Sequence, residues 1–271
     1  MIPLRRLRKW VFVALLLMLA AGFLFAQRTY RGVPLPPPGP VYVAEPVDGD
    51  VLGEFSFARL AYSDPYGPRA MGERPWMIDS PAAERHFLQG LRRLSNIDCK
   101  SKEVYVRATD DEFFDYPWIY VVEPGHWDLS DEEAALIREY LLRGGFVIFD
   151  DFHGSYEWAT FMRGLRKVFP ERPVVDLGPE EEAFHVLYDL EAKEQIPGAQ
   201  MLYTGSTHER GGVTPHWRGI YDDDGRLMVL INFNMDLGDA WEHADWPEYP
   251  ERYTAMAYRL GINYIVYSMT H

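Results

Sequence analysis

Residues 134–154, AALIREYLLRGGFVIFDDFHG, predict an amphipathic helix, a glycine stop, a buried strand and an acidic turn in direct succession. The preceding residues 130–133, Ser-Asp-Glu-Glu, have the capping-box pattern that satisfies backbone donors at a helix start. Gly144 or Gly145 can take the left-handed conformation that ends the helix. Residues 146–149 are uniformly apolar, which is typical of a parallel strand covered on both faces. In such open α/β sheets, ligands bind just beyond the carboxyl ends of the strands.

The remaining chain predicts the other parts of this sheet. Expected strands are residues 55–62, 104–107, 118–122, 217–221 and 226–233, and expected helices are residues 80–94, 155–168 and 249–269. This β-α-β-β-α-β-α succession predicts a mostly parallel sheet with helices on both faces and right-handed crossovers. An acidic turn at residues 222–225 joins the last two strands as a hairpin.

Composition and charge limit the classes of function. The chain has 271 residues, of which 47% are hydrophobic and 15% aromatic, so it can bury a substantial core. Six of the 27 Lys and Arg lie in residues 1–31, which contain no acid. The other 21 accompany all 41 Asp and Glu, a net charge of −20. Such a body repels phosphate backbones, and we expect no nucleic-acid partner.

The amino terminus predicts export. Residues 10–26 form an unbroken apolar run behind four basic residues, so residues 1–31 are expected to be a membrane anchor or a signal segment. The run is longer than a usual signal core and Leu24 would occupy the −3 position of a cleavage site, which favours an uncleaved hydrophobic helix anchored in a membrane. Its basic end would face the cytoplasm, with the domain outside in the cell envelope. Cleavage would instead leave the domain secreted or periplasmic.

A proline-rich linker follows the apolar run. Residues 32–52 contain Pro34, Pro36, Pro37, Pro38 and Pro40, which predict a stiff spacer of polyproline type. Residues 53–271 then form the predicted α/β domain. The chain has one cysteine, Cys99, so no internal disulfide can form and the domain depends on its core for stability.

The helix-to-strand segment that ends in RGGFVIFDD (143–151) resembles the corresponding segment of class I glutamine-amidotransferase-like domains. The body from residue 55 to residue 271 resembles the bacterial family called domain of unknown function 4159 (DUF4159). The matching motifs are FSFARLAY (55–62), NFNMDLGDAWE (232–242) and RLGINYIVY (259–267). The resemblance implies a flavodoxin-like sheet and an exported bacterial protein, without implying a reaction.

One departure from the amidotransferase pattern concerns the nucleophile. Enzymes of that class place a cysteine at the turn after a sheet strand, backed by a histidine. The comparable turn here carries Asp150 and Asp151, whereas Cys99 falls in a helix-to-strand connection. Glutamine hydrolysis by that mechanism is therefore not expected.

The candidate catalytic residues are Asp150, Asp151 and His153, with Glu157 one helical turn further on. Because successive strand residues point to opposite sides, at most two of these four are expected to converge. They could hold a divalent metal, or a carboxylate could act as a general base. The alternative is structural: Asp151 caps the next helix and His153 hydrogen-bonds a loop.

Further candidates for ligand binding follow the neighbouring strands. They are Glu123, His126, Trp127, Asn232, Asn234, Asp236, Trp241, Glu242 and, inside the first strand, Arg59. Structural alternatives exist: a Pro-Gly turn with solvated polar ends for Glu123 and His126, turn formation for the Asn and Asp residues, core packing rather than an exposed sugar-stacking platform for the tryptophans, and a buried ion pair for Arg59. The loop 208–212, HERGG, could fold over the site or remain an ordinary exposed loop.

Three functions are compatible with this pattern. The first is a ligand-binding or interaction module without glutaminase activity, whose partner is an envelope protein complex, a saccharide or a peptide. The second is a hydrolase that acts on carbohydrate or another envelope polymer through Asp150, Asp151 and His153, with or without a divalent metal. The third is a purely structural envelope protein. No cofactor is required by any of the three.

Overall fold

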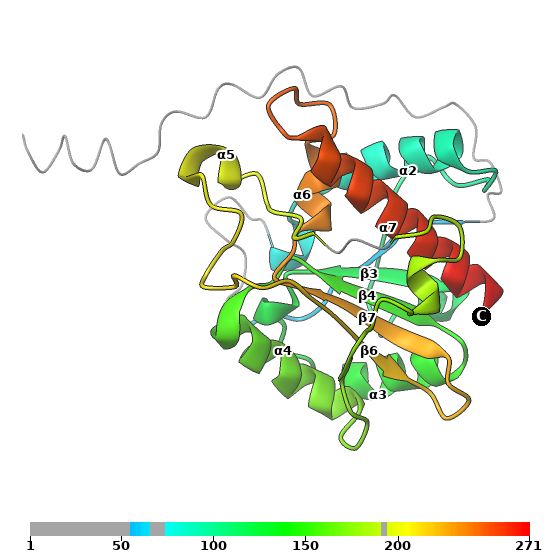
Figure 1. The fold of residues 1–271 in the computed structure, drawn as a ribbon. Coiled ribbons are helices and arrows are strands. Elements are labelled where there is room, and N and C mark those ends of the chain that lie inside the picture. The colour runs from blue at the N-terminus through cyan, green and yellow to red at the C-terminus, as the bar shows by residue number, and fades with distance from the viewer. Residues whose placement is uncertain (1–54, 66–73, 191–193) are drawn as a thin grey trace, which may run out of the picture. The chain divides into compact units, whose positions relative to one another are not determined.

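The computed structural model describes residues 55–65, 74–190 and 194–271. Seven strands form one sheet in the order β2-β1-β3-β4-β7-β6-β5 (Figure 1). Their bounds are β1 Ala58–Leu60, β2 Val104–Val106, β3 Trp118–Val122, β4 Phe146–Asp150, β5 Val175–Asp176, β6 His216–Tyr221 and β7 Leu227–Phe233. The protein is thus a mixed α/β fold with a mostly parallel sheet, as predicted.

Strand β4 lies at the centre of the sheet. It pairs in parallel with β3 on one side and with β7 on the other. The pairs β1–β2 and β1–β3 are also parallel, whereas β6 pairs antiparallel with both β7 and β5. All five residues of β4 are buried, which confirms the interior position that its apolar run predicts.

Helices cover both faces of the sheet. One face carries α2 (Ala82–Leu94), α6 (Leu237–Glu242) and α7 (Glu251–Thr270), and the other carries α3 (Asp131–Leu142) and α4 (Gly154–Val168) (Figure 1). Each face has its own core, and alternate residues of β4 contribute to each: Phe146 and Ile148 to the first, Val147 and Phe149 to the second. Asp150 continues the first set, so it points to the face of α6.

The helix, glycine stop and strand of residues 130–150 fold as their sequence predicts. The Ser130 hydroxyl accepts from Glu133 N at 3.1 Å, and the Glu133 carboxylate accepts from Ser130 N at 2.7 Å, which completes the capping box. Gly144 then takes a φ of 108° and ends the helix. β4 follows directly, and its last residue is Asp150 rather than Phe149.

Shorter elements differ from the predicted boundaries. The expected strand 55–62 pairs continuously only over β1, while Phe55 forms an isolated bridge with Cys99. β5, the short helices α5 (Met201–Thr204) and α6, and the 3-10 helices 75–77, 111–115, 124–126 and 182–184 were not expected. Elements of two to six residues lack the two or more periods that a pattern needs to be recognised.

The predicted anchor and spacer, residues 1–31 and 32–52, lie outside the described residues. Among the residues that the structure does describe, no helix combines the length and apolarity needed to cross a membrane.

Candidate functional site

The carboxyl ends of β3, β4 and β7 are joined by backbone hydrogen bonds beyond the strands themselves. Glu123 N donates to Asp150 O at 3.1 Å, and Asp151 N donates to Met235 O at 3.2 Å. Asn234 N donates to Phe152 O at 3.0 Å. These bonds hold the three polar turns at one edge, which is where ligands bind in open α/β sheets.

Asp150 is fully buried at this edge. Its Oδ2 accepts hydrogen bonds from Tyr120 Oη at 2.7 Å, from Leu237 N at 2.8 Å and from Gly238 N at 3.2 Å. Its Oδ1 has no hydrogen-bond partner among the described residues. Burial raises the pKa of Asp150 to about 7, although the hydrogen bonds to Oδ2 oppose the rise.

The start of α6 contributes two further aspartates. Asp236 is the N-cap residue, and its Oδ1 accepts from Asp239 N at 2.7 Å. Asp239 Oδ2 accepts from Ala199 N at 2.6 Å. Together with Asp79, each of these two residues offers one carboxylate oxygen, and the three oxygens lie within 4.8 Å of one another.

Asp79 reaches this site from the connection between β1 and α2. Its backbone is left-handed, with a φ of 63°, and its Oδ2 is buried without a hydrogen-bond partner in the part of the chain described. The oxygen lies so close to Gly238 that a Cβ there would clash with it. Glycine is therefore required at position 238 for the close approach of Asp79 to α6.

Arg59 fixes the segment that precedes Asp79. Its guanidinium donates to Trp76 O at 3.1 Å and to Ile78 O at 2.6 Å, and it forms an ion pair with Glu84. Both members of the pair are fully buried. Arg59 therefore acts as the structural ion pair, one of its two expected roles, and its contacts position Asp79.

The loop 205–214 lies against the same site. Around Gly198, a Cβ would approach Asp236 Oδ2 at 2.7 Å, Asp239 Oδ2 at 2.9 Å and Glu209 Oε1 at 2.9 Å. The loop is tied down by an ion pair between Arg210 and the buried Glu157. Glu209 thus adds a carboxylate from the loop that precedes β6.

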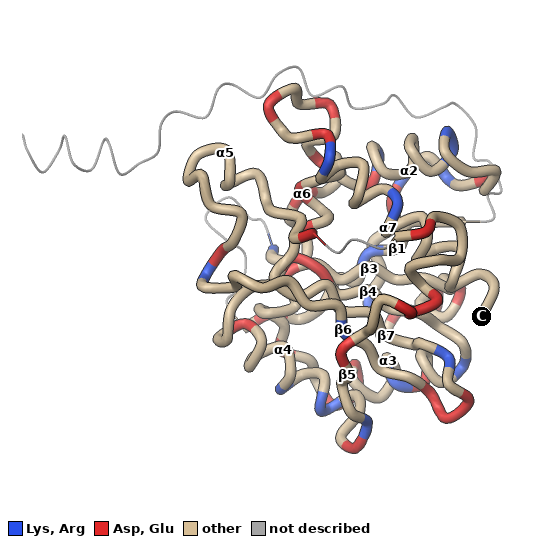
Figure 2. The backbone as a smooth tube through the Cα atoms, viewed as in Figure 1, with Lys and Arg blue, Asp and Glu red and all other residues tan. Residues whose placement is uncertain are grey.

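We call the seven carboxyl groups gathered here the acidic cluster: Asp79, Asp150, Asp151, Glu209, Asp236, Asp239 and Glu242. Red positions gather around α6 and beyond the end of β4 in Figure 2. Burial, followed by the charges of other members, raises the pKa of Asp79 and of Asp236 well above the ordinary range. Burial likewise raises the pKa of Glu242 to about 7.

Cationic side chains near the cluster do not balance its charge. Arg59 is paired with Glu84, and Arg210 is paired with Glu157. His243 Nε2 lies 3.5 Å from Asp239 Oδ1, but burial lowers the pKa of His243 and disfavours its charged form. The cluster therefore holds more carboxyl groups than cationic partners, and the charges of its members raise the pKa of Asp79 and Asp236.

Asp151, a member of the acidic cluster, also forms a pair with His153. His153 Nε2 lies 3.2 Å from Asp151 Oδ1, and His153 is only 2% exposed. Burial lowers the pKa of His153, but the hydrogen bond and charge of Asp151, together with the charge of Glu209, outweigh it and leave the pKa raised. His153 Nδ1 has no hydrogen-bond partner among the residues described.

Glu123 and His126 lie on the side of α4. Glu123 is buried in a left-handed conformation with a φ of 46°, and its carbonyl accepts from Tyr62 Oη at 2.6 Å. His126 Nε2 lies 3.5 Å from Glu157 Oε1. Glu157 also accepts from His153 N, so His126 and the Asp151–His153 pair share a neighbour in α4, whereas Asp236 and Asp239 belong to the start of α6.

Four other candidates serve the fold. Trp127 and Trp241 are buried in the two cores rather than forming an exposed platform, and Trp127 Nε1 donates to Phe161 O at 3.2 Å. Asn232 is fully buried and accepts from Tyr264 Oη at 3.2 Å. Asn234 has a φ of 62°; its side chain accepts from Gly154 N and donates to Thr214 O, which fixes the loop.

Asp79 was not predicted as a site residue. It precedes a helix in an irregular connection, and no spacing relates it to the residues after β4 or β7. The available signal was topological, since a connection that leaves β1 begins at the same sheet edge. Asp239 and Glu209 lie within two segments that were considered in the sequence, residues 232–242 and the loop 208–212.

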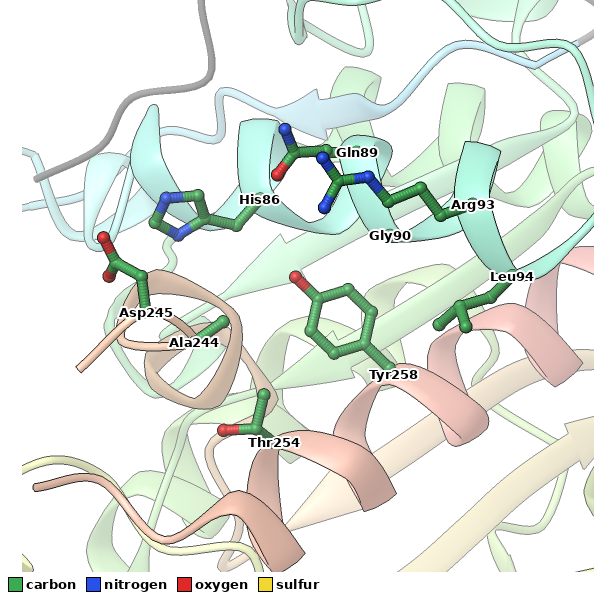
Figure 3. Close-up of a pocket in the computed structure, with 9 residues that line it drawn as sticks. All are labelled: His86, Gln89, Gly90, Arg93, Leu94, Ala244, Asp245, Thr254 and Tyr258. Carbon is green, nitrogen blue, oxygen red and sulfur yellow. The ribbon is translucent and has the colours of Figure 1, made fainter. Parts of the chain in front are cut away.

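A hollow lies between α2, α7 and the turn after α6 (Figure 3). It measures about 370 Å³, and its lining includes His86, Gln89, Arg93, Thr254 and Tyr258. His86 Nδ1 lies 3.0 Å from both Trp241 O and Glu242 O, so this side chain fastens α2 to the end of α6. None of its lining residues belongs to the acidic cluster; Ala244 and Asp245 line it from the turn that follows α6.

Cys99 lies in the connection between α2 and β2 rather than in one of the turns that follow β3, β4 and β7. It is 3% exposed, and its Sγ lies 3.7 Å from Leu88 O, to which it donates. Burial raises the pKa of the Cys99 thiol to about 11, so the sulfur is not a thiolate at neutral pH. These properties oppose a role for Cys99 as a nucleophile.

The sheet and the acidic cluster define an α/β protein of the open, mostly parallel class, with its polar side chains gathered at the carboxyl edge. The family model described as "Domain of unknown function (DUF4159)" matches residues 56–269, so the chain belongs to this family. No curated protein matches the chain.

Proposed function

We propose that this protein is a ligand-binding module whose site is the acidic cluster and whose ligand carries positive charge. The observation that carries the proposal is Asp150: a fully buried carboxylate with an unpartnered oxygen, beside carboxyl groups that raise one another's pKa. An isolated buried carboxylate is costly to a fold unless something compensates it. A cationic ligand would supply the missing interaction.

We further propose that the module is exported and held on the outer side of a bacterial inner membrane by residues 10–26, near an envelope complex, saccharide or peptide. The apolar run and its basic flank support this location. A flavodoxin-like, amidotransferase-like ancestry is supported by the five parallel strands. In the sheet order β2-β1-β3-β4-β7, they follow the 2-1-3-4-5 arrangement of flavodoxin.

The test is a thermal-shift and calorimetric screen of the purified full chain against divalent ions, amines, sugars and basic peptides. A ligand of the cluster raises the melting temperature of the wild type. It fails to do so in Gly198→Val, whose side chain would meet the oxygens of Asp236, Asp239 and Glu209 without changing any charge. If a ligand stabilises Gly198→Val as much as the wild type, and the variant keeps its secondary structure, the ligand binds at another place in the protein.

A hydrolase is the second candidate, and the Asp151–His153 pair favours it. A buried imidazole held by a carboxylate, with its second nitrogen unpartnered among the described residues, can hold or deliver a proton. The corresponding test compares the wild type with His153→Gln on envelope polysaccharides and peptides. Turnover by the wild type that His153→Gln lacks would support hydrolysis; equal turnover would remove His153 from it.

A further inference from the structure

We infer that Asp79, Asp236 and Asp239 bind one divalent cation of the oxygen-preferring class, such as Ca²⁺, Mn²⁺ or Mg²⁺. This inference rests on the proposed function and specifies its ligand. Oxygen ligands lie roughly 2.0–2.6 Å from such ions, so two ligands of one ion can be no more than about 5 Å apart. The three carboxylate oxygens lie within 4.8 Å of one another and meet this limit.

The backbone holds each of the three ligands in place before any ion arrives. Asp236 is fixed as the N-cap of α6 by its bond to Asp239 N, and Asp239 by its bond from Ala199 N. Asp79 is fixed by the hydrogen bonds of Arg59 to Trp76 O and Ile78 O in the preceding turn. A preformed set of ligands loses little conformational entropy on binding.

Asp150 gives independent evidence that a cation belongs here. Its Oδ2 accepts from Leu237 N and Gly238 N, the two amides that lie between Asp236 and Asp239 in the sequence. The same carboxylate therefore stands against the turn that carries two of the ligands. Its Oδ1 is fully buried and unpartnered in the described chain, as is Asp79 Oδ2, which lies next to Gly238, so two buried carboxylate groups beside this turn lack an interaction that a cation could supply.

The chemistry of the donors selects the class of ion. The three ligands are all carboxylates, which suit hard cations better than soft ones. A neighbouring group, formed by Asp239, Glu242 and His243, also lies within 4.8 Å and would suit a transition metal because it includes an imidazole. The two groups share Asp239, and the all-oxygen group is favoured because it includes the buried Asp236 and adjoins Asp150.

Three protein ligands leave coordination positions open. Ca²⁺ takes six to eight oxygen ligands, so at least half of its shell would come from water or from an oxygen-bearing molecule. The Glu209 carboxylate, which shares the surroundings of Gly198 with Asp236 and Asp239, is placed to add a further oxygen. The ion would thus link the loop to α6 and could present an open position to a hydroxyl or carboxylate ligand.

The experiment titrates the chelator-stripped full chain with Mn²⁺ and measures free ion by electron paramagnetic resonance. One site per chain is expected, displaced by Ca²⁺ or Mg²⁺. Asp79→Asn and Asp236→Asn should each weaken Mn²⁺ binding at least tenfold, whereas Asp224→Asn, the same change in the exposed turn after β6, should leave it unchanged. His243→Gln should also leave it unchanged.

Three results would overturn the inference: no bound Mn²⁺ in the wild type, undiminished affinity in both Asp79→Asn and Asp236→Asn, or a loss confined to His243→Gln. Melting temperatures measured in chelator show that each variant is folded. If Mn²⁺ does not bind but an amine or basic peptide still stabilises the wild type and not Gly198→Val, the metal is rejected while the proposed function stands. If nothing binds, both are rejected.

Discussion

Two neighbouring regions of the molecule bury charged side chains, and they differ in how the buried charge is compensated. Arg59 and Glu84 are both fully buried and neutralise each other, and Arg59 Nη1 donates to two backbone carbonyls. The acidic cluster gathers seven carboxyl groups, and the two arginines nearest to it, Arg59 and Arg210, pair with Glu84 and Glu157 outside it. The first region is complete in charge, because each ion has its counter-ion within the fold, whereas the second is incomplete and requires protons or a cation from outside. This difference is the reason why we propose a binding site in the second region and only a structural role for the first.

The largest expected effect comes from breaking the complete region. Arg59→Met leaves Glu84 buried without its partner, and we expect the free energy of unfolding to fall by about 3–5 kcal/mol. Urea unfolding monitored by circular dichroism measures the loss. The double variant Arg59→Met/Glu84→Gln should recover part of it, because the uncompensated charge is gone. A loss below about 1 kcal/mol for Arg59→Met would mean that the two regions do not differ as described.

A pH titration tests the incomplete region. The folded-state pKa of Asp150 is about 7, above the value of about 3.9 in an unfolded chain. The folded state therefore binds more protons between these values, and its stability is highest at low pH and falls as pH rises towards 7. In chelator, we expect a loss on the order of 3 kcal/mol between pH 5 and pH 8. Asp150→Asn should flatten the curve, and stability that rises over this range would contradict the assignment.

Removing one charge from the cluster should have a smaller effect of opposite sign to Arg59→Met. Asp236→Asn keeps an N-cap acceptor and relieves repulsion, so in chelator the variant should be as stable as the wild type or more stable by about 1 kcal/mol. Added Ca²⁺ at about one hundred times its dissociation constant should stabilise the wild type by about 2.7 kcal/mol and the variant by much less. Destabilisation of Asp236→Asn in chelator would show that its charge is structural.

The smallest effect is expected at the loop. The ion pair between Arg210 and Glu157 is partly exposed at the arginine, so Arg210→Gln should change the free energy of unfolding by no more than about 1 kcal/mol. Its influence should appear in kinetics, as a release of Mn²⁺ a few times faster in stopped-flow chelation. Arg172→Gln, which removes an ion pair with Asp223 away from the cluster, provides the matched control.

The sequence predicts the central elements because their signals are local and strong. The capping box at Ser130, the glycine stop and the apolar run of β4 act within a few residues of one another, and the structure has all three. The paired strands β6 and β7 follow from the acidic turn between them. Short elements such as β5 and α6 depend on tertiary contacts and leave no periodic pattern.

The site was predictable only in part. Asp150 and Asp236 could be expected near the carboxyl edge because Asp150 ends the buried strand β4 and Asp236 lies three residues after the end of the buried strand β7. The sequence does not show whether a side chain at this edge is buried or exposed. In the structure, Trp127 and Trp241 are buried in the cores. Asp79 depends on a left-handed backbone, on Gly238 opposite it and on the contacts of Arg59, none of which is visible in local sequence.

The position of β7 has a consequence for the order of assembly. It joins β4 in the sheet, yet the chain makes a long excursion through β5, α5 and β6 before it arrives. During synthesis, β1, β3 and β4 therefore emerge well before Asp236 and Asp239 exist. A cation that needs those two residues cannot guide early collapse of the nascent chain. Such a cation can bind, and stabilise the fold, only after the carboxyl-terminal third of the chain has packed onto the sheet.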